Sequence, residues 1–181
     1  MTDRRQLLWT AFAGLLLLGR PAHAQQPAVF RVQPPEIEGI DEWINSKPLK
    51  LRELKGRVVV LHFWTFGCSN CKNNFAWYRD WQKAFADKDV TIIGIHTPET
   101  DGEAKLDAVK KSVKDAGFTF PVAVDTNKTT WNVWGNRWWP SVYLIDRQGY
   151  ARYRWDGELD WKGAGGQKIM QHKIEALLRE K

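Results

Sequence analysis

Cys68 and Cys71 are the two residues whose type and spacing most directly suggest chemistry. They are the only cysteines in the 181 residues, and two residues separate them. A disulfide that closes so short a loop restricts the unfolded chain very little, so stabilisation of the fold is a poor explanation for it. The pair is therefore predicted to react, by exchanging thiols and disulfides with another molecule.

The predicted surroundings of the pair favour this chemistry. A helical pattern of apolar residues begins at Cys71, shortly after a strongly apolar segment, residues 58–64. The unpaired N–H groups and the positive dipole end at a helix N-terminus favour a thiolate over a thiol. We therefore expect Cys68 to be the exposed nucleophile with a low pKa, and Cys71 to resolve the mixed disulfide. A structural zinc site is not expected, because it needs four ligands and the sequence has no second cysteine pair.

Hydrophobic patterning predicts the elements that must position these cysteines. The segment 58–64 is apolar without alternation, as is typical of a strand buried on both faces of a parallel sheet. A helix is expected over residues 71–85, followed by a second buried strand over 90–95. A further helix is expected over 103–115, because a glycine follows at position 117.

The remaining elements complete an α/β pattern. They are an edge strand or extended connection at 120–124, a short helix at 127–134, two hairpin strands at 139–145 and 150–155, and a helix at 166–180. A βαβ unit joined to a ββα unit predicts a mixed central β-sheet flanked by helices on both faces.

The N-terminal segments are expected to differ from this domain. Residues 1–24 contain two arginines, an apolar stretch and a final small-x-small pattern, which predicts a cleavable signal peptide. An uncleaved anchor is the alternative, and both the general secretory and the twin-arginine routes fit. Residues 25–35 are rich in Gln, Ala and Pro and are predicted to be a flexible tether. The domain itself, residues 36–181, is expected to begin with a hairpin extension that reaches residue 55.

The charge of the chain argues against a nucleic-acid partner. The formal net charge is +6, and the basic residues are spread along the chain. The lysines between residues 105 and 114 fall at helical spacings with aspartates among them. This pattern is typical of a solvated helix face rather than of a basic stripe that binds nucleic acid.

Several motifs together resemble one family. The letters FW precede the CxxC pair, HTPE stands at 96–99, NRWWP at 136–140 and YLID at 143–146. This combination resembles the thioredoxin-like TlpA/ResA class of exported thiol–disulfide oxidoreductases, and more narrowly the thioredoxin-like domain of DipZ-type proteins. The resemblance covers residues 48–160. It implies a thioredoxin fold and disulfide exchange outside the cytoplasm.

The resemblance also implies roles for residues outside the cysteine pair. Pro140 occupies the place of the family's cis-proline. The alternative for Pro140 is an ordinary trans proline at the start of a strand. The backbone of Trp139 would then pair with an extended client peptide, as in strand addition. Trp64, four residues before Cys68, would pack beside the active site and is counted with Trp138, Trp139 and Pro140 among the expected substrate-binding residues.

Tryptophans cluster next to this proline. Trp131, Trp134, Trp138 and Trp139 lie within nine residues of one another. Some of them are expected in the core. Exposed aromatic surface often marks a contact site, so the others, Trp138 among them, are expected to dock a partner around the nucleophile.

Three further side chains are candidates for proton transfer. His62 lies six residues before Cys68, where many thioredoxins carry a buried acid. Its unperturbed pKa near 6.5 suits a relay to the resolving cysteine, but burial lowers such a pKa, and a hydrogen-bonded core histidine is the alternative. His96 and Glu99 follow the second strand at its C-terminal end, on the same rim as Cys68, where they either take part in the chemistry or only shape the loop. Asn74 stands where ResA-like proteins use an acid on the active-site helix.

The expected function is an extracytoplasmic thiol–disulfide oxidoreductase. It would reduce disulfides of client proteins, be re-reduced by a membrane-bound thiol donor, and need no cofactor besides the redox-active Cys68–Cys71 disulfide. The membrane would be a partner only if the signal segment is retained. Two alternatives stay open: copper binding and delivery through both thiolates and His96, and a thiol peroxidase, for which the sequence lacks the usual Pro-x-x-x-Thr-x-x-Cys environment. The residues between the cysteines do not fix the direction of exchange, since potentials in this fold span about −270 to about −120 mV.

Overall fold

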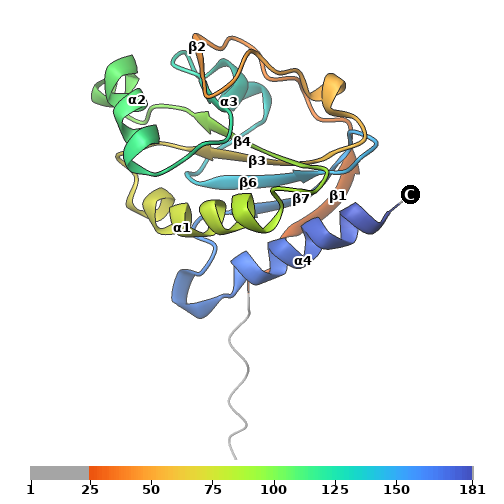
Figure 1. Cartoon of the computed structure of the whole chain (residues 1–181). Helices are drawn as coiled ribbons and strands as arrows, with labels where there is room; N and C mark the ends of the chain where they lie inside the picture. Colours follow the sequence, from red (N-terminus) through yellow and green to blue (C-terminus); the bar gives the residue numbers. More distant parts are fainter. Residues whose placement is uncertain (1–24, 181) are drawn as a thin grey trace, which may run out of the picture.

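A computed structural model describes residues 25–180, and the predicted signal peptide lies outside these residues. Seven strands in this part of the chain form one mixed sheet in the order β1-β7-β6-β3-β4-β5-β2. Helices cover both faces of the sheet (Figure 1). Within residues 25–180, every helix is too short or too polar to cross a membrane.

The elements follow the predicted order closely. The strands are β1 (Ala28–Val32), β2 (Glu42–Ile44), β3 (Val58–Trp64), β4 (Val90–His96), β5 (Val122–Val124), β6 (Ser141–Ile145) and β7 (Ala151–Asp156). The α-helices are α1 (Ser69–Ala84), α2 (Leu106–Asp115), α3 (Thr129–Val133) and α4 (Gly166–Arg179). Short 3-10 helices are η1 (Leu51–Leu54), η2 (Asp101–Ala104) and η3 (Trp161–Gly163).

Strand β3 is the centre of the sheet and leads into the cysteine pair. It runs parallel to β4 and antiparallel to β6. All seven of its residues are buried, which confirms the prediction of a strand covered on both faces. Because side chains alternate along a strand, Val58, Val60 and Trp64 pack in one core cluster. Val59 and Phe63 pack in the other cluster, on the opposite face.

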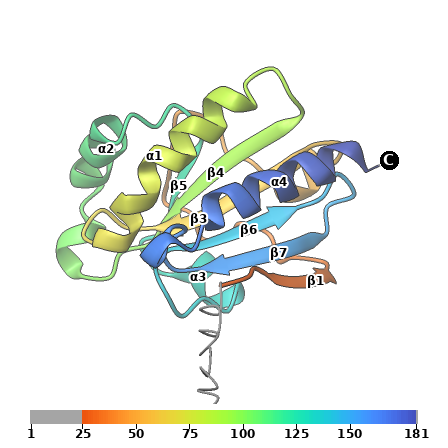
Figure 2. The same cartoon turned by 90° about the horizontal axis from the view of Figure 1, so that it is seen from below.

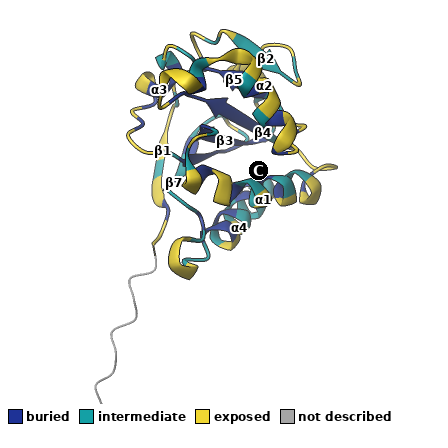
Figure 3. Ribbon diagram, turned by 90° about the vertical axis from the view of Figure 1, so that its left-hand side faces the viewer, coloured by how far each residue is buried: buried dark blue, intermediate teal, exposed yellow. Residues whose placement is uncertain are grey.

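The two clusters correspond to two layers over the sheet. Helices α1 and α4 cover one face (Figure 2). Helix α2 lies beside α1, and residues of both helices line a common groove. On the other face α3 and the segment from Ile37 to Leu54 provide the cover. Figure 3 shows the central strands as the buried layer between these covers. The mixed sheet with helices on both faces is as predicted.

The N-terminal segment differs from the prediction in two ways. Residues 25–35 are not a tether, because β1 pairs antiparallel with β7 and the Gln25 side chain donates to the Asp156 carbonyl at 2.7 Å. The extension is not a hairpin either, since β2 pairs with β5 at the opposite edge of the sheet. Strand β5 therefore lies inside the sheet and is not its edge. Both partners are far away in the sequence, so local patterning could not identify them.

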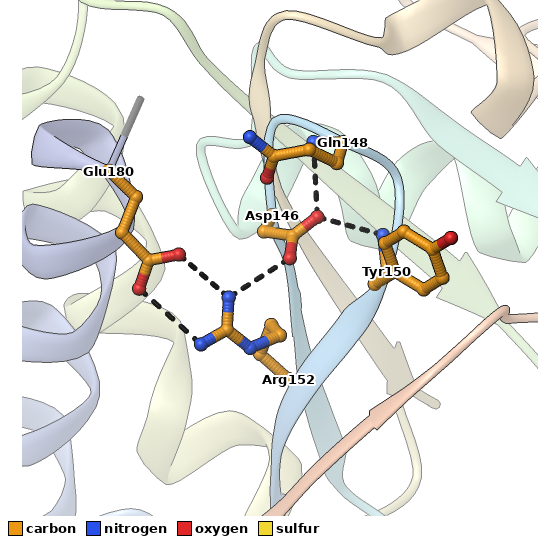
Figure 4. A network of polar contacts seen from close by, with 5 residues as sticks. All are labelled: Asp146, Gln148, Tyr150, Arg152 and Glu180. Carbon is orange, nitrogen blue, oxygen red and sulfur yellow. Dashed lines mark hydrogen bonds and ion pairs between the residues drawn. The ribbon is translucent and has the colours of Figure 1, made fainter.

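A polar network closes the end of the sheet that is distant from the cysteines (Figure 4). In the β6–β7 turn the Asp146 carboxylate accepts hydrogen bonds from the backbone N–H groups of Gln148 and Tyr150, at 3.0 and 2.9 Å. The Arg152 guanidinium donates to Asp146 at 3.0 Å and to Glu180 at 2.7 Å. The network thereby joins the hairpin to the residue that follows α4.

Candidate active site

Cys68 is the N-cap residue of α1. Its backbone is extended, with φ −76° and ψ 117°, and its Sγ accepts a hydrogen bond from the Cys71 N–H at 3.2 Å. The sulfur therefore occupies the position where a helix N-terminus leaves N–H groups unpaired. Helix α1 begins at Ser69, two residues earlier than predicted, because the cap lies at the first cysteine and not at the second.

The two cysteines differ in exposure and in acidity. Both are free thiols, Cys68 half-buried and Cys71 fully buried. A hydrogen bond with the Cys71 side chain lowers the pKa of Cys68 to about 7, helped by the N–H groups of Cys71 and Asn70 and opposed by burial and by the charge of Glu99. Burial, followed by the interaction with Cys68, raises the pKa of Cys71. Cys68 is thus the sulfur that ionises first, and Cys71 keeps its proton.

A cis peptide bond joins Trp139 and Pro140 directly before β6. The strand begins at Ser141, two residues later than predicted. The indole Nε1 of Trp139 donates to the Thr97 carbonyl at 3.0 Å, and its ring stacks on Trp131 at 3.8 Å between centroids. These contacts fix Trp139 between α3 and the loop that follows β4.

A cleft of about 460 Å³ opens beside the nucleophile. Its walls come from three segments, namely the start of α1, the loop after β4 and the loop before β6. The lining residues include Cys68, Glu99, Arg137, Trp138 and Trp139. The Trp138 side chain is 65% exposed, so it forms an apolar rim that another protein can contact.

The four clustered tryptophans divide between the core and the cleft. Trp131 and Trp134 are buried and pack against Phe63 of β3. Trp138 and Trp139 line the cleft.

Contrary to the expectation, Trp64 is not part of a client-binding surface. It is fully buried on the α1 side of β3, where its ring contacts Phe75, His96 and Phe118. The alternation of side chains along β3 turns residue 64 inward beneath α1. Trp64 supports the active site from behind and is too deeply buried to touch a client.

His62 is enclosed by aromatic rings. It stacks on Tyr78 at 3.9 Å and meets Phe118 and Phe120 edge-on. Neither ring nitrogen has a hydrogen-bond partner among residues 25–180, so no hydrogen bond connects His62 to a cysteine. His62 is a buried core histidine, as the alternative predicted, but it lacks the hydrogen bond predicted with it. Burial lowers the pKa of His62 to about 3, which keeps the imidazole neutral near neutral pH.

Asn74 fills the helix position that carries an acid in ResA-like proteins. Its Nδ2 donates to the Tyr78 hydroxyl at 3.3 Å, and its Oδ1 accepts from the Leu159 N–H at 2.8 Å. The Asn74 side chain thus ties α1 to the loop before α4. Burial raises the pKa of Tyr78, so its hydroxyl stays protonated.

The structure separates His96 from Glu99. Glu99 is exposed in the cleft, and its charge raises the pKa of Cys68. His96 is buried, with its ring stacked on Phe66, and burial lowers its pKa to about 4 against the opposing effect of the Glu103 charge.

Three residues in or next to the cleft, Thr65, Gly67 and Glu103, were not predicted from the sequence. Glu103 of η2 is only 7% exposed and accepts a hydrogen bond from the Thr65 hydroxyl at 2.6 Å. Its Oε1 lies against Gly67, where an added Cβ would be 1.7 Å away, so a side chain at position 67 would displace the Glu103 carboxylate. Burial acts to raise the pKa of Glu103, but the hydrogen bonds it accepts outweigh burial and lower it. The only local signal was a threonine directly after a buried strand.

A metal site requires several His, Cys, Asp or Glu side chains around one point. Within residues 25–180, no group of three or more His, Cys, Asp or Glu side chains is arranged to hold a metal ion. His96 therefore does not join the two cysteines in a three-ligand site, which was one form of the copper alternative.

Comparisons with known proteins agree with this geometry. Residues 32–154 match the model of the AhpC/TSA family. Protein DipZ of Mycobacterium tuberculosis is 38% identical over 130 residues, which are 70% of this chain, and the chain spans only 19% of the length of DipZ. The thiol-disulfide oxidoreductase ResA of Bacillus subtilis is 30% identical over 82% of this chain and 84% of its own length.

Solved structures show the same fold. The crystal structure of a thioredoxin-like superfamily protein superimposes with a TM-score of 0.74, at 25% identity, over 83% of this chain and 98% of that chain. A putative thiol:disulfide interchange protein DsbE from Chlorobium tepidum superimposes with a TM-score of 0.69, at 22% identity, over 83% of this chain and 99% of its own. The chain therefore belongs to the AhpC/TSA family, and within it to the thioredoxin-fold thiol–disulfide oxidoreductases.

Proposed function

We propose that this oxidoreductase works outside the cytoplasm and reduces disulfides of client proteins. The observation that carries the proposal is the contrast between the two sulfurs. Cys68 is half-exposed at a helix N-terminus with a pKa lowered to about 7, and Cys71 is buried beneath it with a raised pKa. A reductase needs this contrast, because one thiol must attack a client and the other must wait for the mixed disulfide.

The exchange proceeds in two balanced steps. In the first, the Cys68 thiolate attacks one sulfur of a client disulfide, a mixed disulfide forms, and the other client sulfur leaves as a thiolate that takes up a proton. In the second, Cys71 loses its proton and attacks the Sγ of Cys68. The Cys68–Cys71 disulfide forms and the second client sulfur leaves. The client gains two electrons and the enzyme loses two.

Client binding is assigned to the cleft beside Cys68. An extended client segment would pair with the backbone of Trp139, in the manner of strand addition. The exposed ring of Trp138 provides apolar contact on one rim. Glu99 and Arg137 place opposite charges around the cleft and favour clients with complementary charges near the reacting cystine.

Electrons would be returned by a membrane-bound thiol donor. To reduce the Cys68–Cys71 disulfide, a thiol of the donor must attack Cys68. The donor can reach Cys68 through the same cleft that binds clients. The extracytoplasmic location is supported by the signal-peptide pattern of residues 1–24. No cofactor besides the cysteine pair takes part in either exchange.

The direction of exchange is tested by a redox titration. The protein is equilibrated in glutathione buffers of graded ratio and the state of the pair is followed by tryptophan fluorescence. We expect a potential near the thioredoxin end of the range, about −270 mV. A value near that of strong oxidants, about −120 mV, would show that the protein donates disulfides instead. The reduced protein is assayed with hydrogen peroxide in parallel, and rapid consumption would favour the peroxidase alternative.

A further inference from the structure

A buried polar cluster lies directly behind the active-site loop. It consists of Thr65, which follows β3, His96, which ends β4, and Glu103 of η2, and we call it the Thr65 cluster. The Thr65 hydroxyl donates to Glu103 Oε2 at 2.6 Å, and the His96 Nε2 lies 3.4 Å from the Thr65 Oγ1. Thr65 and His96 are fully buried and Glu103 is 7% exposed. Burying a carboxylate costs free energy, so a buried Glu103 next to the active site suggests that this carboxylate has a function there.

The cluster reaches the resolving sulfur through Thr65. The backbone of Thr65 lies close enough to the Cys71 sulfur for its N–H to favour the thiolate form of Cys71. Thr65 therefore contacts the buried sulfur with its backbone and Glu103 with its side chain. The hydrogen bond from the Thr65 hydroxyl to Glu103 therefore also restrains the position of the Thr65 backbone N–H.

Glu103 is itself held on two sides. Its Oε2 also accepts the Glu99 N–H at 2.7 Å, and its Oε1 lies against Gly67. The carboxylate thus connects the loop after β3, which leads to Cys68, with the loop after β4, which forms a wall of the cleft.

We propose that Glu103 is a positioning residue for the second step of exchange. Through Thr65 it holds the N–H donor that stabilises the Cys71 thiolate at the moment when Cys71 must attack the mixed disulfide. The inference rests on the exchange chemistry proposed for Cys68 and Cys71. The proposal assigns to Glu103 of η2 a role in supporting Cys71. On α1, the position where ResA-like proteins carry an acid is occupied by Asn74, which has no carboxylate.

Several ionisable groups surround the Cys71 sulfur and bear on its pH dependence. Cys68 at the N-cap of α1, Tyr78 on α1 and Glu99 after β4 interact with it directly. Three further groups lie one residue away from these contacts: His62 of β3 stacks on Tyr78, and His96 of β4 and Glu103 of η2 lie against Thr65. Of these, Glu103 alone accepts a hydrogen bond from Thr65. Removing its carboxylate should therefore affect Cys71 and leave Cys68 nearly unchanged.

The test uses 5,5′-dithiobis(2-nitrobenzoic acid) with the reduced full chain. Release of the first aryl thiolate reports attack by Cys68, and release of the second reports attack by Cys71. We expect Glu103→Gln and Thr65→Val to slow the second release about tenfold, the effect of weakening one hydrogen bond to a charged group. Both variants should also move the pH midpoint of the second release upward. Thr65→Ser keeps the hydroxyl and should restore the rate.

Controls separate positioning from general damage. Asp101→Asn removes an exposed carboxylate from the same 3-10 helix and should change neither release. An unchanged second release in Glu103→Gln and Thr65→Val, or equal slowing of both releases, would overturn the proposal. If Glu103→Gln does not fold, the contrast between Thr65→Val and Thr65→Ser decides. If the wild type itself releases no second thiolate, the exchange chemistry fails, which is a separate outcome.

Discussion

The backbone N–H of Cys71 donates a hydrogen bond to the Sγ of Cys68 at 3.2 Å, so the cap of α1 and the reactive pair are one structure. The helix end stabilises the ionised sulfur, and that sulfur completes the hydrogen bonding of the helix end. The buried thiol of Cys71 adds a second stabilising contact. The reactivity of Cys68 therefore depends on both the helix and its partner.

Alkylation of Cys68 should follow a pKa of about 7. The rate with iodoacetamide is expected to rise as the pH increases through this value and then to level off, because the thiolate is the reacting form. Cys71→Ala removes the contact that lowers this pKa most, so its profile should shift to higher pH. Superimposable profiles for the two proteins would show that the helix end acts alone.

The charge of Glu99 should hold the pKa of Cys68 above the value it would otherwise have. Glu99→Gln is therefore expected to shift the alkylation profile to lower pH. Asp101→Asn, a neutralisation two residues away, provides the matched control. A shift of equal size in both variants would indicate a general charge effect and would remove the specific role of Glu99.

Trp138 should matter for protein clients and not for small disulfides. Trp138→Ala is expected to lower kcat/KM for reduction of a protein client about tenfold, as for a central aromatic contact residue. The rate with a small aromatic disulfide should change little. Trp161→Ala removes another exposed tryptophan, 52% exposed and outside the cleft lining, and should change neither rate. Equal loss with both kinds of substrate would place Trp138 in the chemistry itself.

His62 should make the fold sensitive to acid. Its pKa is about 3 in the folded protein and near 6.5 in the unfolded chain, so the unfolded state binds more protons between these values. His62 alone should therefore lower the free energy of unfolding as the pH decreases below 6.5, by about 2 kcal/mol from pH 7.5 to pH 5. Urea unfolding of the wild type and of His62→Leu at both pH values isolates this contribution.

His62→Leu should reduce the acid sensitivity, and His172→Gln, at an exposed histidine, should keep it. Part of the sensitivity should remain in His62→Leu, because burial also lowers the pKa of His96. An unchanged pH dependence in His62→Leu would show that the ring becomes hydrated or protonated without loss of the fold.

The elements with local patterns were predictable from the sequence. The apolar segment of β3 and the amphipathic pattern of α1 identified both elements that carry the cysteines. Strands β1 and β2 were not predicted, since each depends on a partner far along the chain. Glu103 was missed for the same reason: its partner Thr65 is 38 residues away, and an acidic residue near a helix start suggests only a solvated turn.

The most direct test of the central claim is a trapping experiment with single-cysteine variants. Cys71→Ser lacks the resolving thiol, so it should accumulate mixed disulfides with client proteins of an extracytoplasmic extract, each joined through Cys68 and released by a reductant. Cys68→Ser should capture none, because its remaining thiol is buried and has a raised pKa. Capture through Cys71 in Cys68→Ser, or no capture by Cys71→Ser while the wild type turns over clients, would contradict the roles assigned to the two sulfurs.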